Sequence, residues 1–352
     1  MQRGGPGTVS GRVVVCALGG FVRDGHLPAS TYLDRRWIYG GERSMYEIAA
    51  AAAVAGHTVE LRGDLSRPAL EAILSASGAT VETSLPSRLP QPDDVIIVPE
   101  GITDPGFYDA IGGRGARRVM ALLGPPGLFG PALEEGFSAP DSLTVPLDQV
   151  GTVEHYRQLA GFELWTNSPR VAAEAAEAAV ECLFVGTGQP VPFPEHVPKL
   201  HPVAYVGANR WAPLARQAAS AVSVPVLEIG EGGRDSVVRA IASAQLLLLP
   251  VRIEGQSRLQ LEARAVGTVP IALSSNRYAA GMDEAGGAVL VDSVDEMAPA
   301  LEKLLADTDL LGELSRRARS TARAQLDWRR YVTRVAAALH RAPVTEGVER
   351  PG

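Results

Sequence analysis

One stretch, LLLLPVRIEGQSRLQLEARAVGTVPIALS at residues 246–274, constrains the fold more than any other part of the sequence. It opens with four leucines, an apolar run too short for an ordinary helix and typical of a buried parallel strand. Pro250 ends this run and a turn follows. Good helix formers then fill 256–266, Gly267 ends the helix, and 269–273 is a second apolar run. This order predicts a βαβ unit of a parallel sheet.

Two acids, Glu254 and Glu262, bracket the turn and the start of this helix. At about 1.5 Å of rise per residue they lie roughly 12 Å apart, close to the span from sugar ring to ribose in a nucleotide diphosphate sugar. The helix N-terminus between them suits a diphosphate, and carboxylates accept hydrogen bonds from paired sugar hydroxyls. The simpler alternative is that Glu254 caps the helix and Glu262 is a solvated acid. Spacing alone favours that alternative.

The segment resembles the glutamate-x7-glutamate region of family 4 retaining glycosyltransferases. The matching residues are Pro250, Glu254, Gly255, Leu261, Glu262, Ala263, Gly267 and Pro270. The sequence departs from the family at Gln256, Ser257 and Arg258, where phenylalanine, glycine and leucine are usual. Ser257 and Arg258 leave the backbone amides available, and Arg258 places a positive charge beside the phosphates. The resemblance therefore implies a donor site that includes Leu259 as well as these residues.

A second similarity to the family lies in GGERSMYEIAAAAAVAGHTVEL, residues 40–61. In the family, paired glycines begin the first helix, and here Gly40 and Gly41 permit close approach of the backbone to a diphosphate. A plain glycine turn before a helix is the alternative. Other strand-like runs lie at 12–18, 58–62, 80–83, 95–99, 119–123, 162–166, 182–185, 203–207, 224–229 and 288–291.

The alternation of strand-like and helical runs predicts an α/β chain with doubly wound sheets. The resemblance implies a GT-B fold, in which two Rossmann-like domains face each other across a cleft. We expect an acceptor-binding domain at 1–188, a proline-rich linker at 189–202, a donor-binding domain at 203–325, a C-terminal helix at 326–342 that crosses back to the first domain, and a tail at 343–352.

Further donor contacts come from the resemblance. In the family, the first loop of the second domain carries an arginine and, five or six residues later, a lysine, both on the donor phosphates. Arg210 and Arg216 have a comparable spacing and follow Gly207, a third candidate for this loop. Together with Glu254, the two arginines are the predicted catalytic residues. Two solvated arginines would produce the same pattern.

The acceptor site is predicted from composition alone. The aromatic, arginine-containing loop at 19–39 is long for a compact domain, and such loops are usually functional or disordered. Arg23 and Arg35 suit a carboxylate or phosphate, whereas its aromatic residues suit stacking on a ring or enclosing a quaternary ammonium. Those aromatic residues are Tyr32, Trp37 and Tyr39. An ordered loop packed on its own aromatics is the alternative. Glu100, at a strand end where such sheets bind ligands, is a further candidate for the acceptor site. In the family a histidine near the position of Gly124 often touches the donor sugar, and here that contact is either absent or supplied elsewhere, with Glu100 as the candidate.

Composition excludes several classes of protein. A net charge of −7 disfavours extended nucleic-acid binding, and no apolar run approaches the eighteen residues that cross a membrane. The two cysteines, Cys16 and Cys182, are typical of a reducing compartment, so a cytoplasmic protein is expected. Asp307-Thr308-Asp309 spells a DxD but lies between two helical patterns, where helix capping is expected rather than metal binding.

The expected function is therefore transfer of a sugar, with retention, from a UDP- or GDP-sugar to a small soluble acceptor, without metal or cofactor. A nucleotide-sugar epimerase of similar architecture and a catalytically inactive sugar-nucleotide-binding module are the alternatives. A nicotinamide dehydrogenase is disfavoured because no G-x-G-x-x-G directly follows a strand.

Overall fold

The chain divides into two compact units, which are described separately. The computed structural model describes residues 11–17, 26–27, 29–33, 40–100, 115–128, 147–159, 161–208, 211–279 and 281–341. Of the described residues, those up to Val191 except Leu147 and those from Trp328 onward belong to the first unit, and Leu147 and Pro192–Asp327 belong to the second.

The first unit contains a parallel six-stranded sheet in the order β3-β1-β5-β6-β7-β8. Its strands are β1 (Val13–Cys16), β3 (Val59–Arg62), β5 (Val95–Pro99), β6 (Arg117–Leu122), β7 (Glu163–Thr166) and β8 (Cys182–Phe184). Its helices are α1 (Gly40–Val54), α2 (Arg67–Ser77), η1 (Leu147–Gln149), α4 (Val153–Gln158), α5 (Pro169–Glu177) and α11 (Trp328–Leu339). Two short strands, β2 (Thr31–Leu33) and β4 (Asp64–Ser66), pair parallel beside it.

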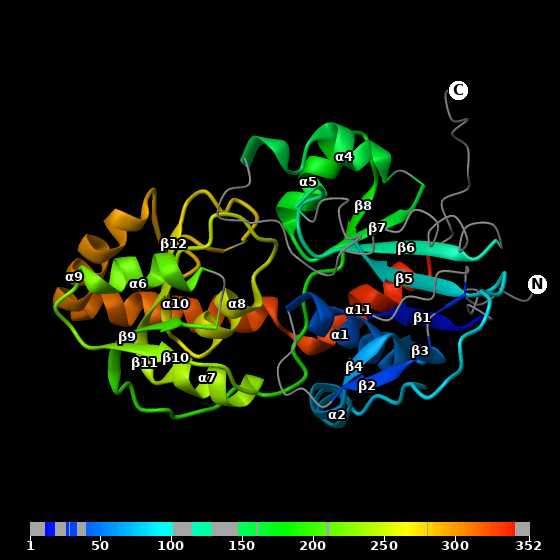
Figure 1. Cartoon of the computed structure of the whole chain (residues 1–352), viewed down its shortest axis with the longest axis horizontal. Helices are drawn as coiled ribbons and strands as arrows, with labels where there is room; N and C mark the ends of the chain where they lie inside the picture. The colour runs from blue at the N-terminus through cyan, green and yellow to red at the C-terminus, as the bar shows by residue number, and fades with distance from the viewer. Residues whose placement is uncertain are drawn as a thin grey trace, which may run out of the picture. The chain divides into compact units, whose positions relative to one another are not determined.

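The core of this unit follows from its composition. The central strands consist almost wholly of valine and isoleucine and are buried, as expected for a parallel sheet covered on both faces. The alanines at 49–52 on α1 are also buried, so this helix packs closely. Tyr331 and Val335 of α11 belong to the same core cluster, and Figure 1 shows α11 lying beside α1. The last helix of the chain therefore belongs to the first unit.

Three local predictions for this unit need correction. The expected strand at 80–83 is wrong, because only Glu82 pairs there, through a single bridge to Glu60. The expected irregular loop at 19–39 contains β2. Helix α2 was not predicted, although Ser66 caps its N-terminus and Gly78 ends it in the left-handed conformation, at φ +69°.

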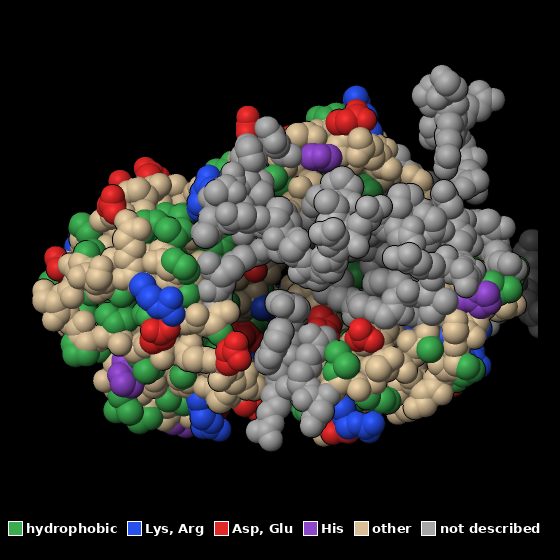
Figure 2. Space-filling view, viewed as in Figure 1, with side chains coloured by type: hydrophobic (Ala, Val, Ile, Leu, Met, Phe, Trp, Pro, Cys, Tyr) green, Lys and Arg blue, Asp and Glu red, His purple; other side chains and the backbone are tan. Residues whose placement is uncertain are grey.

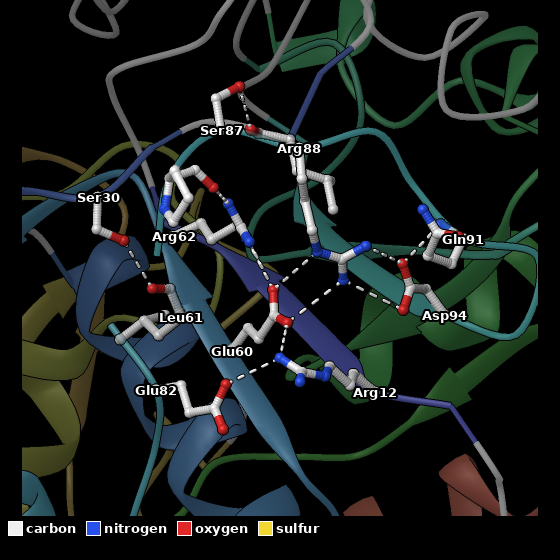
Figure 3. Close-up of polar contacts among 12 residues, drawn as sticks. Arg12, Ser30, Glu60, Leu61, Arg62, Glu82, Ser87, Arg88, Gln91 and Asp94 are labelled. Carbon is white, nitrogen blue, oxygen red and sulfur yellow. Dashed lines mark hydrogen bonds and ion pairs between the residues drawn. The ribbon is translucent and has the colours of Figure 1, made fainter. Parts of the chain in front are cut away.

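A charged cluster fastens β3 to the segment that follows α2 (Figure 3). The buried carboxylate of Glu60 accepts hydrogen bonds from Arg12 at 2.5 Å, Arg62 at 2.7 Å and Arg88 at 3.4 Å. Arg88 also donates to Asp94 at 2.8 Å. The hydrogen bonds from these guanidinium groups outweigh desolvation and lower the pKa of Glu60, so the acid stays ionised although its side chain is fully buried.

The second unit contains a parallel five-stranded sheet in the order β10-β9-β11-β12-β13. Its strands are β9 (His201–Val206), β10 (Val226–Ile229), β11 (Ala244–Leu249), β12 (Val269–Leu273) and β13 (Val289–Val291). Its helices are α6 (Ala212–Ser220), α7 (Arg234–Ala242), α8 (Arg258–Ala265), η2 (Val294–Glu296), α9 (Met297–Ala306) and α10 (Thr308–Gln325). The predicted βαβ unit is present as β11-α8-β12.

Hydrogen bonds inside the second unit connect its helices and loops. Arg264 of α8 is fully buried and donates to the carbonyl of Gly286 at 3.0 Å and to Thr321 of α10 at 2.8 Å. Burial lowers its pKa to about 10, which still leaves the guanidinium charged at neutral pH. Asp307 accepts a hydrogen bond from the Leu310 amide at 2.9 Å and caps α10, as predicted for the DxD sequence.

Both sheets share one topology, which determines where ligands bind. In each, the first strand in sequence lies between the second and the third, so the direction of winding reverses between the first and third strands. Ligands of open α/β sheets bind at the carboxyl ends of the strands at such a switch point. The switch point of the first sheet lies between β1 and β5, and that of the second lies between β9 and β11.

Candidate functional site

The switch point of the second sheet is formed by the segments that follow β9 and β11. Gly207 directly follows β9, and its amide donates to Ile229 at 2.8 Å. A Cβ at this position would lie 2.3 Å from the carboxylate of Glu228, so a larger residue would displace that side chain. The loop from Pro250 to Ser257 follows β11 and leads into α8. The glutamate-x7-glutamate segment therefore lies at the switch point.

The N-terminus of α8 is enclosed by its own loop. Ser257 is the N-cap residue, and its side chain makes no capping hydrogen bond. Gln256, Ser257 and Arg258 are all buried, with Arg258 the most exposed at 9%. The first amides of a helix have no acceptor within that helix, and the macrodipole makes this end positive. With the Arg258 side chain in its first turn, α8 provides a positive N-terminus at the switch point.

Glu262 is not the solvated acid of the simpler alternative. It is 8% exposed, and its Oε1 accepts a hydrogen bond from Nε of Arg234 at 2.8 Å. Arg234 is the first residue of α7, and its guanidinium also lies 5.2 Å from the centre of the Phe193 ring. This ion pair was not predicted, because its two members are separated by 28 residues.

Glu254 is not the helix cap of that alternative either, because Ser257 occupies the capping position. The amide of Glu254 donates to Oδ1 of Asn276 at 3.1 Å. Next to it, the Ser275 hydroxyl donates to the carbonyl of Arg252 at 3.0 Å. The loop after β12 therefore holds the loop after β11, which carries Glu254 and Gly255.

Gly286 and Gly287 lie in the loop before β13, where packing requires glycine. A Cβ on Gly286 would lie 1.9 Å from the carbonyl oxygen of Gly281, and one on Gly287 would lie 2.1 Å from the backbone nitrogen of Ala318. Both glycines are buried. The close approach of Gly281 requires Gly286, and the close approach of α10 requires Gly287.

Arg216 lies on α6, with its guanidinium paired to Glu228 at 2.6 Å. Tyr205 donates a hydrogen bond to the same carboxylate. The hydrogen bond to Glu228 raises the pKa of Arg216, and the hydrogen bond from Arg216 lowers the pKa of Glu228. Both side chains are about half exposed, at 52% and 46%. Arg210, the other predicted phosphate ligand, lies outside the described residues.

In the first unit, Gly40 and Gly41 begin α1, as the similarity to the family's first helix implies. The next turn of this helix contains a buried ion pair that was not predicted. Arg43 donates to Glu47 at 3.0 Å and to Gln189 at 2.9 Å. Helical spacing of i and i+4 is the sequence signal for the first of these contacts. The contact of the two glycines with a diphosphate stays a prediction.

Glu100 directly follows β5, at the switch point of the first sheet. Its Oε2 is buried without a hydrogen-bond partner among the described residues, and the amide of Gly127 donates to its carboxyl group. Burial raises the pKa of Glu100 to about 8, so at neutral pH the group is a carboxylic acid. His155 of α4 lies against Gly127, where a Cβ would be 2.4 Å from the imidazole ring, and its Nδ1 is also buried without a partner.

Of the other predicted acceptor residues, the structure describes Tyr32. It lies in β2, its hydroxyl is hydrogen-bonded to Thr83, and its ring lies 4.2 Å from the Arg67 guanidinium. The ring and the hydroxyl of Tyr32 therefore have partners within the first unit, Arg67 and Thr83. Arg23, Arg35, Trp37 and Tyr39 lie outside the described residues.

Three further observations concern charge, metal ligands and membrane spans. On the face in Figure 2, the coloured Lys and Arg side chains are scattered among acidic ones. Within the ranges that the structure describes, no group of three or more His, Cys, Asp or Glu side chains is arranged to hold a metal ion. Over the same ranges, no helix has the length and apolar character needed to cross a membrane.

Comparison with known proteins finds similarity in structure rather than in sequence. No protein-family model matches the chain, and no curated protein matches it. Among solved structures, sucrose-phosphate synthase from Thermosynechococcus elongatus matches with a TM-score of 0.62 and 12% identity, over 93% of this chain and 98% of that one. HepE from Anabaena in complex with UDP matches with a TM-score of 0.58 and 11% identity, over 93% and 99%. A glycosyltransferase from Rickettsia africae matches with 0.57 and 11%, over 96% and 100%.

These neighbours are glycosyltransferases of the GT-B fold, and at such low identity the likeness establishes the fold alone. The chain is an α/β protein with two Rossmann-like domains and has the GT-B fold, which confirms the predicted fold class.

Proposed function

We propose that this protein is a retaining glycosyltransferase of the family 4 type, which transfers a sugar from a nucleotide diphosphate sugar to a small soluble acceptor. The observation that carries the proposal is the position of Glu254, the N-terminus of α8 and Glu262 at the switch point of the second sheet. HepE, which has the same fold, has been solved with UDP and with UDP-glucose, which favours a uridine nucleotide as the donor.

The nucleoside end of the donor is assigned to Glu262. A carboxylate accepts hydrogen bonds from two neighbouring ribose hydroxyls. Arg234 donates a hydrogen bond to Oε1 of Glu262 and holds the side chain in one orientation. The same hydrogen bond therefore sets the direction of Oε2. Since the pair is largely buried, the orientation of the carboxylate is fixed before the donor arrives.

The diphosphate is assigned to the N-terminus of α8, where Arg258 adds a positive charge. During transfer, the bond between the anomeric carbon and the diphosphate oxygen breaks, and a bond forms from that carbon to an acceptor hydroxyl oxygen on the same face. The hydroxyl proton passes to the leaving diphosphate. Helix amides and Arg258 lower the barrier by stabilising the charge that develops on this leaving group. Glu254 is assigned to the hydroxyls of the donor sugar, and Arg210 and Arg216 are further phosphate ligands in the proposal.

The acceptor is assigned to the first unit, with Glu100 as its binding residue. A carboxylic acid that is neutral at pH 7 donates a hydrogen bond, and no described residue is hydrogen-bonded to the buried Oε2 of Glu100. Such a group favours an uncharged hydroxyl over a phosphate or a carboxylate. We further propose that the reaction takes place in the cytoplasm and without a metal ion or cofactor, on the sequence arguments given above.

Nucleotide binding is the first test. Unfolding temperatures are measured with UDP, GDP and thymidine diphosphate, for the wild type, Glu262→Ala and Glu302→Ala, an exposed glutamate on α9 that serves as the matched control. We expect one nucleotide to raise the unfolding temperature of the wild type and of Glu302→Ala but not of Glu262→Ala. No response from the wild type to any of the three would contradict the proposal.

Activity is the second test. Incubation with the sugar nucleotide selected above, followed by NMR, distinguishes the candidate functions. Release or transfer of the sugar with the anomeric configuration retained supports the glycosyltransferase. An epimerised nucleotide sugar in the absence of acceptor would indicate an epimerase, and binding without any turnover across an acceptor screen would indicate an inactive module.

A further inference from the structure

Gln260 of α8 is a buried amide with no hydrogen-bond partner among the described residues. The residue has no exposed surface, and neither its Nε2 nor its Oε1 is bonded to any side chain or backbone group in the part of the chain that the structure describes. A buried amide offers donors and an acceptor, and leaving both unbonded is unfavourable. The other buried polar side chains described above on this helix, Glu262 and Arg264, have hydrogen-bond partners. A glutamine here costs stability unless another polar group meets it.

A small cavity lies beside this amide. It has a volume of about 10 Å³, which is the space for one water-sized group. Gln260 lines it together with Ser257, the N-cap residue of α8, and Asn276. The last residues of β11 and β12, Leu249 and Leu273, form part of the wall, so the cavity lies at the carboxyl edge of the sheet.

The cavity is connected to Glu254 by one hydrogen bond. Asn276 lines the cavity and also accepts the hydrogen bond from the Glu254 amide through its Oδ1. Besides this hydrogen bond, Asn276 offers a second lone pair on Oδ1 and the two donors of its NH₂ group. A group that both donates and accepts would join Gln260 to Asn276.

We propose that this cavity binds a single O–H group, and that Gln260 thereby orients Asn276 and the backbone of Glu254. The group is either an ordered water or a hydroxyl of the donor sugar, since both have the required size and both donate and accept. Gln260 is thus a positioning residue for the sugar end of the donor. The role of Gln260 in positioning the donor sugar rests on the proposed function. The presence of an O–H group in the cavity does not depend on that function.

Substitution of the amide tests the consequence. Gln260→Leu keeps the approximate size and removes both hydrogen-bonding groups, and Gln217→Leu, at an exposed position on α6, is the matched control. Affinities for UDP and UDP-glucose are measured by calorimetry, and unfolding temperatures are recorded in parallel. Gln260→Met serves as a second variant if the first does not fold.

We expect Gln260→Leu to unfold close to the wild-type temperature, because the apolar side chain removes the buried amide together with the O–H group that it binds. Its affinity for UDP-glucose is expected to fall about tenfold while its affinity for UDP changes by less than about twofold, since Glu262 holds the nucleoside end. A purely structural role would change both affinities together. Equal losses for the two ligands, or no loss for UDP-glucose, would overturn the positioning role.

A high-resolution crystal structure tests the O–H group directly. Density for one oxygen beside Gln260 in the free protein supports the inference, and its replacement by a sugar hydroxyl in a UDP-glucose complex identifies the donor as the source. An oxygen that stays in both structures identifies a permanent water. A cavity that is empty in the free protein and in the complex would overturn the inference. Failure of the wild type to bind UDP or UDP-glucose would count against the proposed function, while the free structure still decides whether the cavity holds an oxygen.

Discussion

Glu100 makes the stability of the first unit depend on pH in a direction opposite to that of an ordinary salt-bridged acid. Burial raises its pKa from 4.5 to about 8, so the folded protein keeps a proton that the unfolded chain loses. The stabilisation from this proton is complete below the unfolded pKa and is lost as pH rises toward the folded pKa. Between about pH 5 and about pH 7.5 the loss is on the order of 3 kcal/mol, at about 1.36 kcal/mol per pKa unit.

Glu100→Gln should remove this dependence, because an amide of nearly the same shape stays neutral throughout. The variant is expected to match the wild type near pH 5 and to exceed it by roughly 3 kcal/mol near pH 7.5. The free energy of unfolding is measured in urea at both pH values, with hydrogen exchange of the β5 amides as a readout specific to the first unit. Glu71→Gln, at an exposed position of α2, is the control. Parallel pH curves for the wild type and Glu100→Gln would refute the argument.

Three further substitutions have defined outcomes. Glu60→Gln leaves the buried Arg62 guanidinium without its charged partner and should lower the free energy of unfolding, measured in urea, by about 3 kcal/mol. Because the pKa of Glu60 is lowered in the folded protein, the stabilisation by Glu60 is present at neutral pH. It is lost only as pH falls through that lowered pKa. Arg234→Met should cost about 2 kcal/mol and weaken UDP binding in calorimetry, since the Glu262 carboxylate loses its partner, and unchanged affinity would contradict the assigned orientation. Asp307→Ala should cost about 1 kcal/mol through loss of the helix cap, with UDP affinity unaltered.

Local sequence patterns were sufficient for most of the elements that carry the candidate site. The leucine run, Pro250 and Gly267 act on residues close to them in the chain. They predicted both ends of β11, α8 and β12 to within two residues. Asp307 was likewise recognised as a cap. The expected strand at 80–83 failed for the same reason, because a β-rich tetrapeptide forms a strand only if a partner strand pairs along its whole length.

What the sequence determined by itself was the strand–helix–strand order of β11, α8 and β12 and the positions of Glu254 before α8 and Glu262 within it, since both depend on residues close together in the chain. Only the tertiary structure decided what those acids contact. Arg234 meets Glu262 because α7 and α8 are neighbours on one sheet, and Asn276 reaches Glu254 because β11 and β12 end at the same edge. Sequence spacing does not determine such meetings, because parallel strands bring distant residues together through the pairing of the strands.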